Sequence, residues 1–299
     1  MSQIVHYTQC PVCRSTDIQP VLQAKDYTVS GELFSIWHCD SCSVRFTQDV
    51  PAADAIGPYY QSAAYVSHSD TKKGLINRLY HLVRNYTLGK KKALVQKEAG
   101  RETGSLLDVG AGTGAFAYAM QKAGWRVTGL EPDETARRNA LAQYQLNLQT
   151  PETLFQFGDA QFDVITMWHV LEHVHDVSAY LQTYRRILQP GGCLIIAVPN
   201  YTSYDAQLYH QYWAAYDVPR HLYHFSPNSM QALMQQFGFT VKKRKPMRFD
   251  SFYVSMLSEQ YKNGKPNLLK ACWNGLQSNL KAGAEAGHCS SVIYIIQKT

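Results

Sequence analysis

The stretch Leu106-Leu107-Asp108-Val109-Gly110-Ala111-Gly112-Thr113-Gly114 decides the fold of this chain. Its first four residues predict a short buried strand, and the run that begins at Ala115 predicts a helix. Glycine lets the backbone turn sharply between the two and lets a ligand approach without a Cβ in the way. Free N–H groups at the start of the helix would complete the cradle. The stretch therefore indicates a nucleotide-type site, although its glycines also fit the dinucleotide fingerprint G-x-G-x-x-[GA].

The order of strands and helices around this stretch predicts an α/β fold. Strands and helices alternate from residue 105 onward, which is typical of a doubly wound, Rossmann-like seven-stranded sheet with its ligand at the carboxyl ends of the strands. A polar stretch, residues 259–287, is interpreted as a variable insertion before the last strand. Strands are expected over residues 106–109, 125–130, 146–148, 162–167, 193–198, 239–245 and 292–297.

Length and composition describe a globular chain of at most two domains. The chain has 299 residues, of which 45% are hydrophobic and 17% charged. Neither a bilayer-spanning apolar run nor a signal peptide is evident, so we expect a cytoplasmic protein without a membrane partner. Much of the net charge of +6 comes from basic runs at 90–92 and 242–248. Such runs are usually solvated surfaces, and nucleic-acid binding is the less favoured interpretation.

Four cysteines near the N-terminus have the spacing of a metal site. Cys10 and Cys13 form one C-x-x-C pair, and Cys39 and Cys42 form a second. The two-residue spacing lets both thiolates of a pair reach one ion, so the pattern predicts a tetrahedral, structural Zn²⁺ site. Disulfide-bonded or reduced pairs are the alternative, which a cytoplasmic location disfavours. We expect residues 1–50 to form a zinc ribbon of β-hairpins and residues 51–104 to form a linker followed by helices.

An ordered set of further motifs resembles one family. Leu130-Glu131-Pro132-Asp133 follows the glycine stretch, then Phe162-Asp163-Val164-Ile165 leads to Val170-Leu171-Glu172-His173-Val174, and Leu188-x-Pro190-Gly191-Gly192 comes last. Over residues 75–299 the set resembles the class I S-adenosylmethionine-dependent methyltransferases. With the ribbon, the chain resembles zinc-ribbon-bearing members, some of which act on sugars or small metabolites. The resemblance implies that residues 105–299 bind S-adenosylmethionine, or S-adenosylhomocysteine as the bound product.

The resemblance and the chemistry of the cofactor select the candidate binding residues. A carboxylate at the carboxyl end of a strand can accept both ribose hydroxyls, which suits Glu131, and Asp108 is expected near the cationic end of the methionine moiety. Pro151-Glu152-Thr153-Leu154 is expected at the adenine, in preference to Gly158-Asp159. For Trp168, plain core packing is an equal alternative. The predicted cofactor contacts are Tyr65, Asp108, Gly110, Ala111, Gly112, Gly114, Glu131, Pro132, Glu152, Thr153, Met167, Trp168 and His169.

Methyl transfer to a hydroxyl or a carbon acid needs a base beside the acceptor. The aromatic-rich segment 199–225 follows a predicted central strand and is interpreted as a lid over the substrate. His169, His221 and His224 are the candidate catalytic residues, because imidazole titrates near neutral pH. For His221 and His224 a structural role is equally favoured, and a metal-binding pair is less favoured because no matching carboxylate pattern is evident.

These features leave three functions open. The first is a methyltransferase acting on an oxygen or carbon of a small molecule, such as a sugar or secondary metabolite, which the aromatic lid favours. The second is an RNA or protein methyltransferase that holds its substrate with the ribbon and the basic stretch 242–248. The third is a non-catalytic cofactor-binding module. Arg220 could clamp an anionic substrate or pair with Asp217. The oligomeric state is not specified by the sequence.

Overall fold

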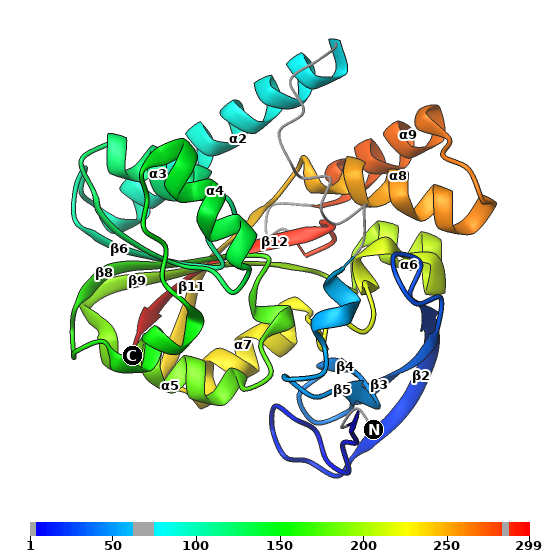
Figure 1. The fold of residues 1–299 in the computed structure, drawn as a ribbon. Helices are drawn as coiled ribbons and strands as arrows, with labels where there is room; N and C mark the ends of the chain where they lie inside the picture. Colours follow the sequence, from blue (N-terminus) through cyan, green and yellow to red (C-terminus); the bar gives the residue numbers. More distant parts are fainter. Residues whose placement is uncertain (1–3, 62–74, 283–286) are drawn as a thin grey trace.

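The centre of the molecule is a six-stranded sheet with the strand order β11-β12-β9-β8-β6-β7 (Figure 1). The chain is described by a computed structural model that covers residues 4–61, 75–282 and 287–299, with the backbone alone for residues 75–82. β7, β6, β8 and β9 pair in parallel, and β12 runs antiparallel between β9 and β11. The strands are β6 (Ser105–Val109), β7 (Arg126–Leu130), β8 (Phe162–Trp168), β9 (Leu188–Pro199), β11 (Phe239–Pro246) and β12 (Ser291–Lys298).

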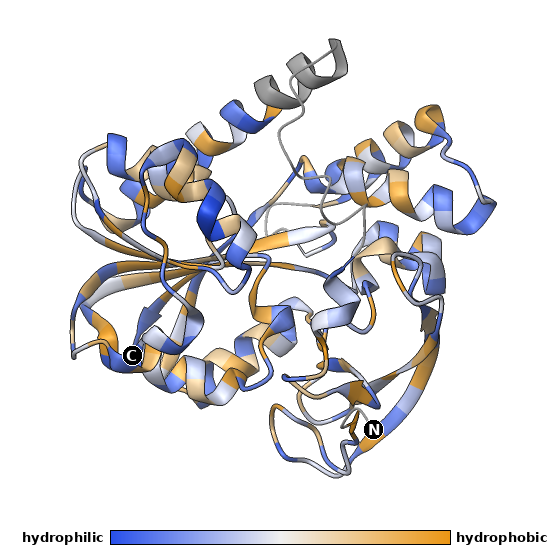
Figure 2. Ribbon diagram, viewed as in Figure 1, coloured by the Kyte–Doolittle hydropathy of each residue, from blue (hydrophilic) through white to orange (hydrophobic). Residues whose placement is uncertain are grey.

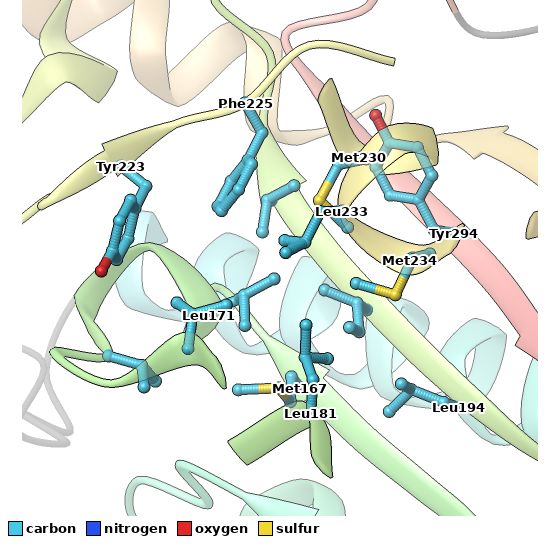
Figure 3. Close-up of a cluster of buried hydrophobic side chains, with 14 of the residues drawn as sticks. Met167, Leu171, Leu181, Leu194, Tyr223, Phe225, Met230, Leu233, Met234 and Tyr294 are labelled. Carbon is cyan, nitrogen blue, oxygen red and sulfur yellow. The ribbon is translucent and has the colours of Figure 1, made fainter. Parts of the chain in front are cut away.

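The α/β fold expected from the alternating pattern is confirmed, with helices on both faces of the sheet. α2, α3 and α4 lie on one face, and α5 and α7 lie on the other. Figure 3 shows Leu181 of α5, Met234 of α7 and Leu194 of β9 in the hydrophobic core between the sheet and the helices of the second face. Ser226 begins α7 with a capping box, as its position before Pro227 predicts. The helices are α2 (Leu75–Ala99), α3 (Ala115–Lys122), α4 (Glu134–Tyr144), α5 (Val177–Ile187) and α7 (Pro227–Gln236).

Strands that are covered on both faces explain the apolar runs in the sequence. Every residue from Gly192 to Pro199 in β9 is buried, so the outward-facing polar positions of a half-exposed strand are missing. Figure 2 shows apolar residues along the central strands and a mixture of apolar and polar residues on the helices around them. The parallel pairing of β7, β6, β8 and β9 places their carboxyl ends at one edge of the sheet, where the candidate site lies.

The seventh strand expected over residues 146–148 does not form. The segment makes a single parallel bridge to the sheet, between Leu130 and Gln149. Leu146 and Leu148 are buried instead in a small cluster between α3 and α4. Leu148 lies so close to Gly129 that a Cβ at the glycine would come within 2.4 Å of the leucine Cδ2. Two backbone hydrogen bonds of Gln149, to Gly129 and from Glu131, and the packing of the two leucines hold the segment beside β7 without a ladder. The described sheet therefore has six strands rather than seven.

The N-terminal region forms the expected ribbon of β-hairpins, and the lid contributes a strand to it. β2 (Ile18–Lys25), β3 (Leu33–Cys39) and β4 (Arg45–Thr47) form an antiparallel sheet that β10 (Tyr223–His224) extends by pairing with β4. The expected boundary at residue 50 falls inside β5 (Val50–Pro51), which pairs with β1 (Ile4–Val5). Ribbon and lid therefore share one sheet, while the division of the chain into domains remains a prediction.

The segment interpreted as a polar insertion, residues 259–287, covers the end of helix α8 (Asp250–Asn263) and all of helix α9 (Leu268–Lys281). They pack on each other and on α6 (Tyr204–Tyr209) of the lid. Asp205 of α6 accepts hydrogen bonds from Ser278 of α9 and from Trp213 of the lid, both at 2.7 Å. Buried positions in these helices are thus occupied by hydrogen-bonded polar side chains. The apolar periodicity that would predict a helix is therefore weak in the sequence. In the described ranges, no helix is long and apolar enough to cross a membrane.

Candidate cofactor and active site

The glycine loop between β6 and α3 holds a backbone conformation that favours glycine. Gly110, Gly112 and Gly114 have φ angles of 70°, 54° and 79°. A Cβ on Gly110 would come within 2.4 Å of a valine side chain, whereas a Cβ on Gly112 would meet nothing within 4 Å. The N–H of Ala111 donates to the carbonyl oxygen of Leu130 and ties the loop to β7. The middle glycine therefore faces open space at the carboxyl end of β6, as a ligand cradle requires.

Glu131 closes on this loop from the end of β7. Its carboxylate accepts hydrogen bonds from the N–H groups of Gly112 at 2.7 Å and Asp133 at 2.9 Å, and only 8% of the residue is exposed. Burial raises the pKa of Glu131, and the two N–H donors oppose that shift. Arg137 braces the turn by donating to the carbonyl oxygen of Pro132 at 2.7 Å. Each carboxylate oxygen keeps a free lone pair, so Glu131 can still accept hydroxyl groups of a ligand.

Asp108 lies buried below the glycine loop and is 1% exposed. Its carboxylate accepts a hydrogen bond from Thr166 at 2.7 Å. Burial raises the pKa of Asp108 to about 7, and the Thr166 hydrogen bond and the nearby ammonium of Lys91 oppose this shift. Lys91 comes from α2 and is half-buried, and burial lowers its pKa to about 8. The sequence signal for Lys91 was its place in the basic run 90–92, which was interpreted as a solvated surface.

The segment expected at the adenine lies next to Glu131. The N–H of Glu131 donates to the carbonyl oxygen of Gln149 at 2.9 Å, and the short 3-10 helix η2 (Pro151–Gln156) begins two residues later. Within η2, Glu152 is exposed and Thr153 is half-buried. Both can therefore reach a ligand that extends from Glu131, and their contact with the cofactor remains a prediction.

The end of β8 sends two neighbouring side chains to opposite faces of the sheet. Met167 is buried in the core on the α5 side (Figure 3). Trp168 packs edge to face on Phe116, with 5.5 Å between ring centroids, and the Nζ atom of Lys91 lies 4.3 Å from the Trp168 ring. Core packing accounts for Trp168 as well as a cofactor contact would. Tyr65, a further predicted contact, lies outside the described residues.

His169 follows Trp168 and is placed between two carboxylates. Its φ of 59° is unusual for a residue other than glycine, and its N–H donates to the carbonyl oxygen of Ala197. Nδ1 lies 3.4 Å from Oε1 of Glu172, and Nε2 lies 3.9 Å from Oδ2 of Asp250. Burial alone would lower the pKa of His169, but the two carboxylates outweigh burial and raise it. The side chain is 28% exposed and so is accessible from solvent.

Glu172 is a site residue outside the candidates predicted from the sequence. It lies in the 3-10 helix η3 (Leu171–His173) and is 1% exposed. Within the described ranges, its carboxylate oxygens have no well-formed hydrogen bond, and the nearest imidazole nitrogen is Nδ1 of His169 at 3.4 Å from Oε1. Burial alone would raise the pKa of Glu172, but the surrounding imidazoles lower it. Ligand atoms of Glu172, His173 and His221 all lie within 4.8 Å of one another. The signal in the sequence was the Glu172-His173 pair inside the family motif.

His221 and His224 are both buried, in different surroundings. The ring of His221 packs edge to face on His173, with 4.6 Å between centroids. His224 Nε2 lies 3.1 Å from the hydroxyl of Thr47 in β4, and burial holds its pKa well below the usual value. His224 is therefore neutral within the shared ribbon–lid sheet. The residues whose ligand atoms converge with His221 are His173 and Glu172, so the carboxylate missing from the sequence pattern is present in the fold.

Arg220 is fully buried and paired, so it does not clamp a substrate. Its guanidinium lies 2.7 Å from Asp217 and 2.8 Å from Asp26, and it donates to the carbonyl oxygen of Tyr59 at 2.8 Å. Of the two roles considered from the sequence, pairing with Asp217 is the one observed. Asp26 comes from the ribbon, 194 residues earlier in the chain, and adds a second carboxylate that local sequence patterns do not indicate.

The four N-terminal cysteines converge in the ribbon. The Sγ atoms of Cys10 and Cys42 are 3.7 Å apart, those of Cys13 and Cys39 are 3.5 Å apart, and all four lie within 4.8 Å of one another. Four sulfurs at about 2.3 Å from one zinc ion are about 3.8 Å apart in a tetrahedron. The four thiols are free, at distances longer than a disulfide bond, and so fit a tetrahedral metal site.

Comparisons with known proteins agree with this geometry. Residues 81–243 match a family model described as a methyltransferase domain. A ubiquinone biosynthesis O-methyltransferase from Caulobacter vibrioides is 35% identical over 106 residues, which cover 33% of this chain and 42% of the relative. A protein of the same name from Hydrogenovibrio crunogenus is 27% identical over 155 residues, covering 48% of this chain and 64% of the relative. The chain spans about half the length of the curated relatives it matches.

A solved structure supports the fold. The crystal structure of a candidate sarcosine dimethylglycine methyltransferase from Galdieria sulphuraria has a TM-score of 0.50 at 17% identity, and the match covers 75% of this chain and 88% of that one. The family model spans more than half of the present chain and contains the glycine loop, Glu131 and the motif around Glu172. S-adenosylmethionine is the cofactor of this methyltransferase fold. The chain belongs to the class I S-adenosylmethionine-dependent methyltransferases.

Proposed function

We propose that the chain transfers a methyl group from S-adenosylmethionine to an oxygen or carbon atom of a small molecule, such as a sugar or a secondary metabolite. When bound, the cofactor supplies an electrophilic methyl group on a sulfonium. The open face of Gly112 and the carboxylates of Glu131 and Asp108 suit its ribose and its cationic groups. The names of the relatives, which refer to O-methylation in ubiquinone biosynthesis, support a small-molecule acceptor.

The observation that carries this proposal is the pair formed by His169 and Glu172. His169 is partly exposed at the end of β8, and its Nδ1 lies 3.4 Å from the buried carboxylate of Glu172. A carboxylate behind an imidazole orients the ring and stabilises its protonated form, as a general base requires. In the proposed reaction Nε2 of His169 takes the proton that the acceptor loses as its oxygen or carbon bonds to the methyl group.

The lid provides a fixed wall for this site. Tyr209, Trp213 and Tyr216 are buried in one cluster with Phe34 and Ile36 of the ribbon. Most of the lid aromatics are therefore used in packing, and they hold the lid as one body against the ribbon. Near His169, Asp250 of α8 contributes a carboxylate 3.9 Å from Nε2, and these two side chains are proposed to face the acceptor.

An RNA or protein acceptor is the competing function, and the basic stretch 242–248 gives it little support. Lys243 and Lys245 lie 2.7 Å and 3.5 Å from the carboxylate of Glu98, and Arg244 donates to Gln231 at 2.7 Å. Three of the five basic side chains in this stretch therefore have partners within the protein. A non-catalytic cofactor-binding module, the remaining alternative, would not need an imidazole–carboxylate pair at the strand end.

We also propose that Cys10, Cys13, Cys39 and Cys42 hold one structural Zn²⁺ ion and that the protein works in the cytoplasm. Four thiolates close a tetrahedral coordination sphere and leave no position for a substrate. The sulfur distances described above support this site. Free thiols persist in a reducing compartment, which supports the proposed location.

Transfer of a labelled methyl group separates the three functions. The full chain is incubated with methyl-labelled S-adenosylmethionine and, in separate reactions, with a small-metabolite extract, total RNA or total protein. We expect label in the metabolite fraction, and we expect His169→Asn to reduce the rate of labelling strongly. Label confined to RNA or protein would contradict the proposal. Calorimetric binding of S-adenosylhomocysteine without label in any fraction would favour the non-catalytic module.

A further inference from the structure

Glu172, His173 and His221 form a second cluster of metal-ligating side chains, separate from the four cysteines. We propose that this cluster binds a divalent transition-metal ion of the Zn²⁺ class, through one carboxylate oxygen and two imidazole nitrogens. Three protein ligands leave one coordination position for a water molecule. The site goes beyond the proposed methyl transfer. Glu172 takes part in both, so the tests of the metal site measure metal content and coordination and not turnover.

The carboxylate of Glu172 is the first argument for this site. It is 1% exposed, and in the part of the chain that the structure describes neither of its oxygens accepts a hydrogen bond. A buried charged group without hydrogen bonds is costly, and such groups are normally paired or coordinate a metal. In the ion pair with His169, Nδ1 lies at a long distance of 3.4 Å from Oε1 of Glu172. Glu172 therefore has coordination capacity that its protein neighbours do not use.

The second argument is the orientation of the two imidazoles. Nδ1 of His173 lies 3.0 Å from the carbonyl oxygen of Arg220, and Nδ1 of His221 lies 2.8 Å from that of Ala215. Each Nδ1 can donate its proton to a backbone carbonyl, and Nδ1 of His173 also has the hydroxyl of Tyr60 at 3.1 Å. In this tautomer a lone pair is left on Nε2 of both rings. Metal-binding histidines commonly use this arrangement, in which the outer hydrogen bond fixes the tautomer and the ring.

The third argument is that the backbone already brings the ligands together. The N–H of Leu222 donates to the carbonyl oxygen of Glu172 at 2.8 Å. This bond joins the lid next to His221 to η3, which carries Glu172 and His173. The ligand atoms lie within 4.8 Å of one another, and atoms bound to one zinc ion at about 2.1 Å would be about 3–4 Å apart. Small rotations of the three side chains therefore suffice to complete the site.

X-ray absorption at the zinc edge tests the site on the unmodified full chain. A ribbon site alone would show sulfur neighbours at about 2.3 Å. The proposed site adds nitrogen and oxygen neighbours at about 2.0–2.2 Å. Elemental analysis of the same sample should give two metal ions per chain. A spectrum with sulfur neighbours alone would overturn the proposal, whatever the number of metal ions per chain.

A pair of lid variants assigns the second ion to its ligands. We expect His221→Gln to lower the metal content from two ions to one and to remove the nitrogen and oxygen neighbours from the spectrum. His224→Gln is the matched control, because it alters a buried histidine of the same lid whose ligand atom is not part of the cluster, and it should keep both ions. Glu172→Gln, which preserves the shape of the side chain, should behave as His221→Gln does. Retention of two ions by both ligand variants would refute the assignment.

Discussion

The guanidinium of Arg220, in the lid, lies 2.8 Å from the carboxylate of Asp26, in the ribbon, and both side chains are almost completely buried. Asp26 also accepts hydrogen bonds from the N–H groups of Thr28 and Ser30, in the turn between β2 and β3. Burial alone would raise the pKa of Asp26, but Arg220 and these N–H donors lower it to about 2. A buried charge pair thus joins two segments that also share a sheet.

Removal of this charge should destabilise the whole protein. We expect Asp26→Asn to lower the free energy of unfolding at pH 7 by up to about 3–5 kcal/mol, because it leaves Arg220 with one buried carboxylate fewer. Urea denaturation measures the effect, and Asp54→Asn, at an exposed position, should stay within about 0.5 kcal/mol of the parent. Because the pKa of Asp26 is lower in the folded state, its stabilisation is present above pH 4 or so and lost as the pH falls towards about 2. Equal stability of Asp26→Asn and the control would show that the contact does not hold the lid.

Removal of zinc from the ribbon should disturb the lid, because the two share strand β10. Because β10 pairs with β4 of the ribbon, we expect chelation to reduce methyl transfer strongly while binding of S-adenosylhomocysteine persists. The glycine loop and Glu131 follow β6 and β7 of the central sheet and are held to each other by the hydrogen bond between Gly112 and Glu131, which does not involve β10. Parallel calorimetry and activity assays, with zinc added back as the control, test this. Loss of both properties together would mean that the ribbon supports the whole fold.

Replacement of Glu131 should lower the affinity of the protein for the cofactor. We expect Glu131→Ala to reduce S-adenosylhomocysteine affinity by about 1.5–3 kcal/mol, the scale of hydrogen bonds to a charged group. The control is Glu134→Ala, which removes a nearby exposed carboxylate that pairs with Arg138 in α4. Calorimetry should show an almost unchanged affinity for the control. Unchanged affinity of Glu131→Ala, or tighter binding of NAD by the parent chain, would contradict the cofactor assignment.

Cofactor affinity should depend on pH through Asp108. The pKa of Asp108 is raised to about 7, so the carboxyl is largely protonated at lower pH. A cationic ligand favours the ionised form, so we expect affinity to rise with pH up to about 7 and then level off, with a limiting slope of about tenfold per pH unit. Calorimetry between pH 5.5 and 8.5 measures the slope, and Asp108→Asn should bind more weakly without it. A slope that survives in Asp108→Asn would assign the titration to another group.

Local patterns in the sequence predicted much of the fold, and long-range pairing explains the rest. Short spacings in the sequence were enough to predict three features: the glycine stretch, Glu131 and the two cysteine pairs. The structure brings the residues of each feature together. β10 has two residues, too few for any periodicity, and its partner β4 lies far away in the sequence. Lys91 was assigned to a solvated surface because nothing near it in the sequence shows that α2 passes over Trp168.

Two further differences have the same physical origin. The expected strand at 146–148 has the right composition, but Leu148 packs over Gly129, and side-chain packing decides between a strand and a loop there. The surroundings of Glu172 combine a turn after β8 with a loop of the lid, so the carboxylate that completes the histidine cluster comes from about 50 residues away. A ligand cluster of this kind depends on tertiary contacts, so it can be recognised only once the positions of η3 and of the lid are known.

The three candidate histidines should differ in their effect on turnover, because their surroundings differ. His169 is partly exposed beside Glu172 and Asp250, whereas His224 is buried, neutral and bonded to Thr47. We expect His169→Asn to lower turnover by about 10²–10⁴-fold, the usual contribution of a general base, with almost unchanged affinity for S-adenosylhomocysteine. Asparagine is the chosen replacement because it tolerates the positive φ at this position.

The matched control is His224→Asn, which should change stability more than turnover per folded molecule. Because the pKa of His224 is depressed in the folded state, the unfolded chain binds the extra proton, and the parent should lose stability as the pH falls below about 6.5. That loss should be smaller in His224→Asn. Initial rates with the acceptor from the labelled extract, normalised to the folded fraction, compare both variants with the parent. Near-normal turnover of His169→Asn would leave His221, or positioning alone, to account for the reaction, because no proton would then pass through His169.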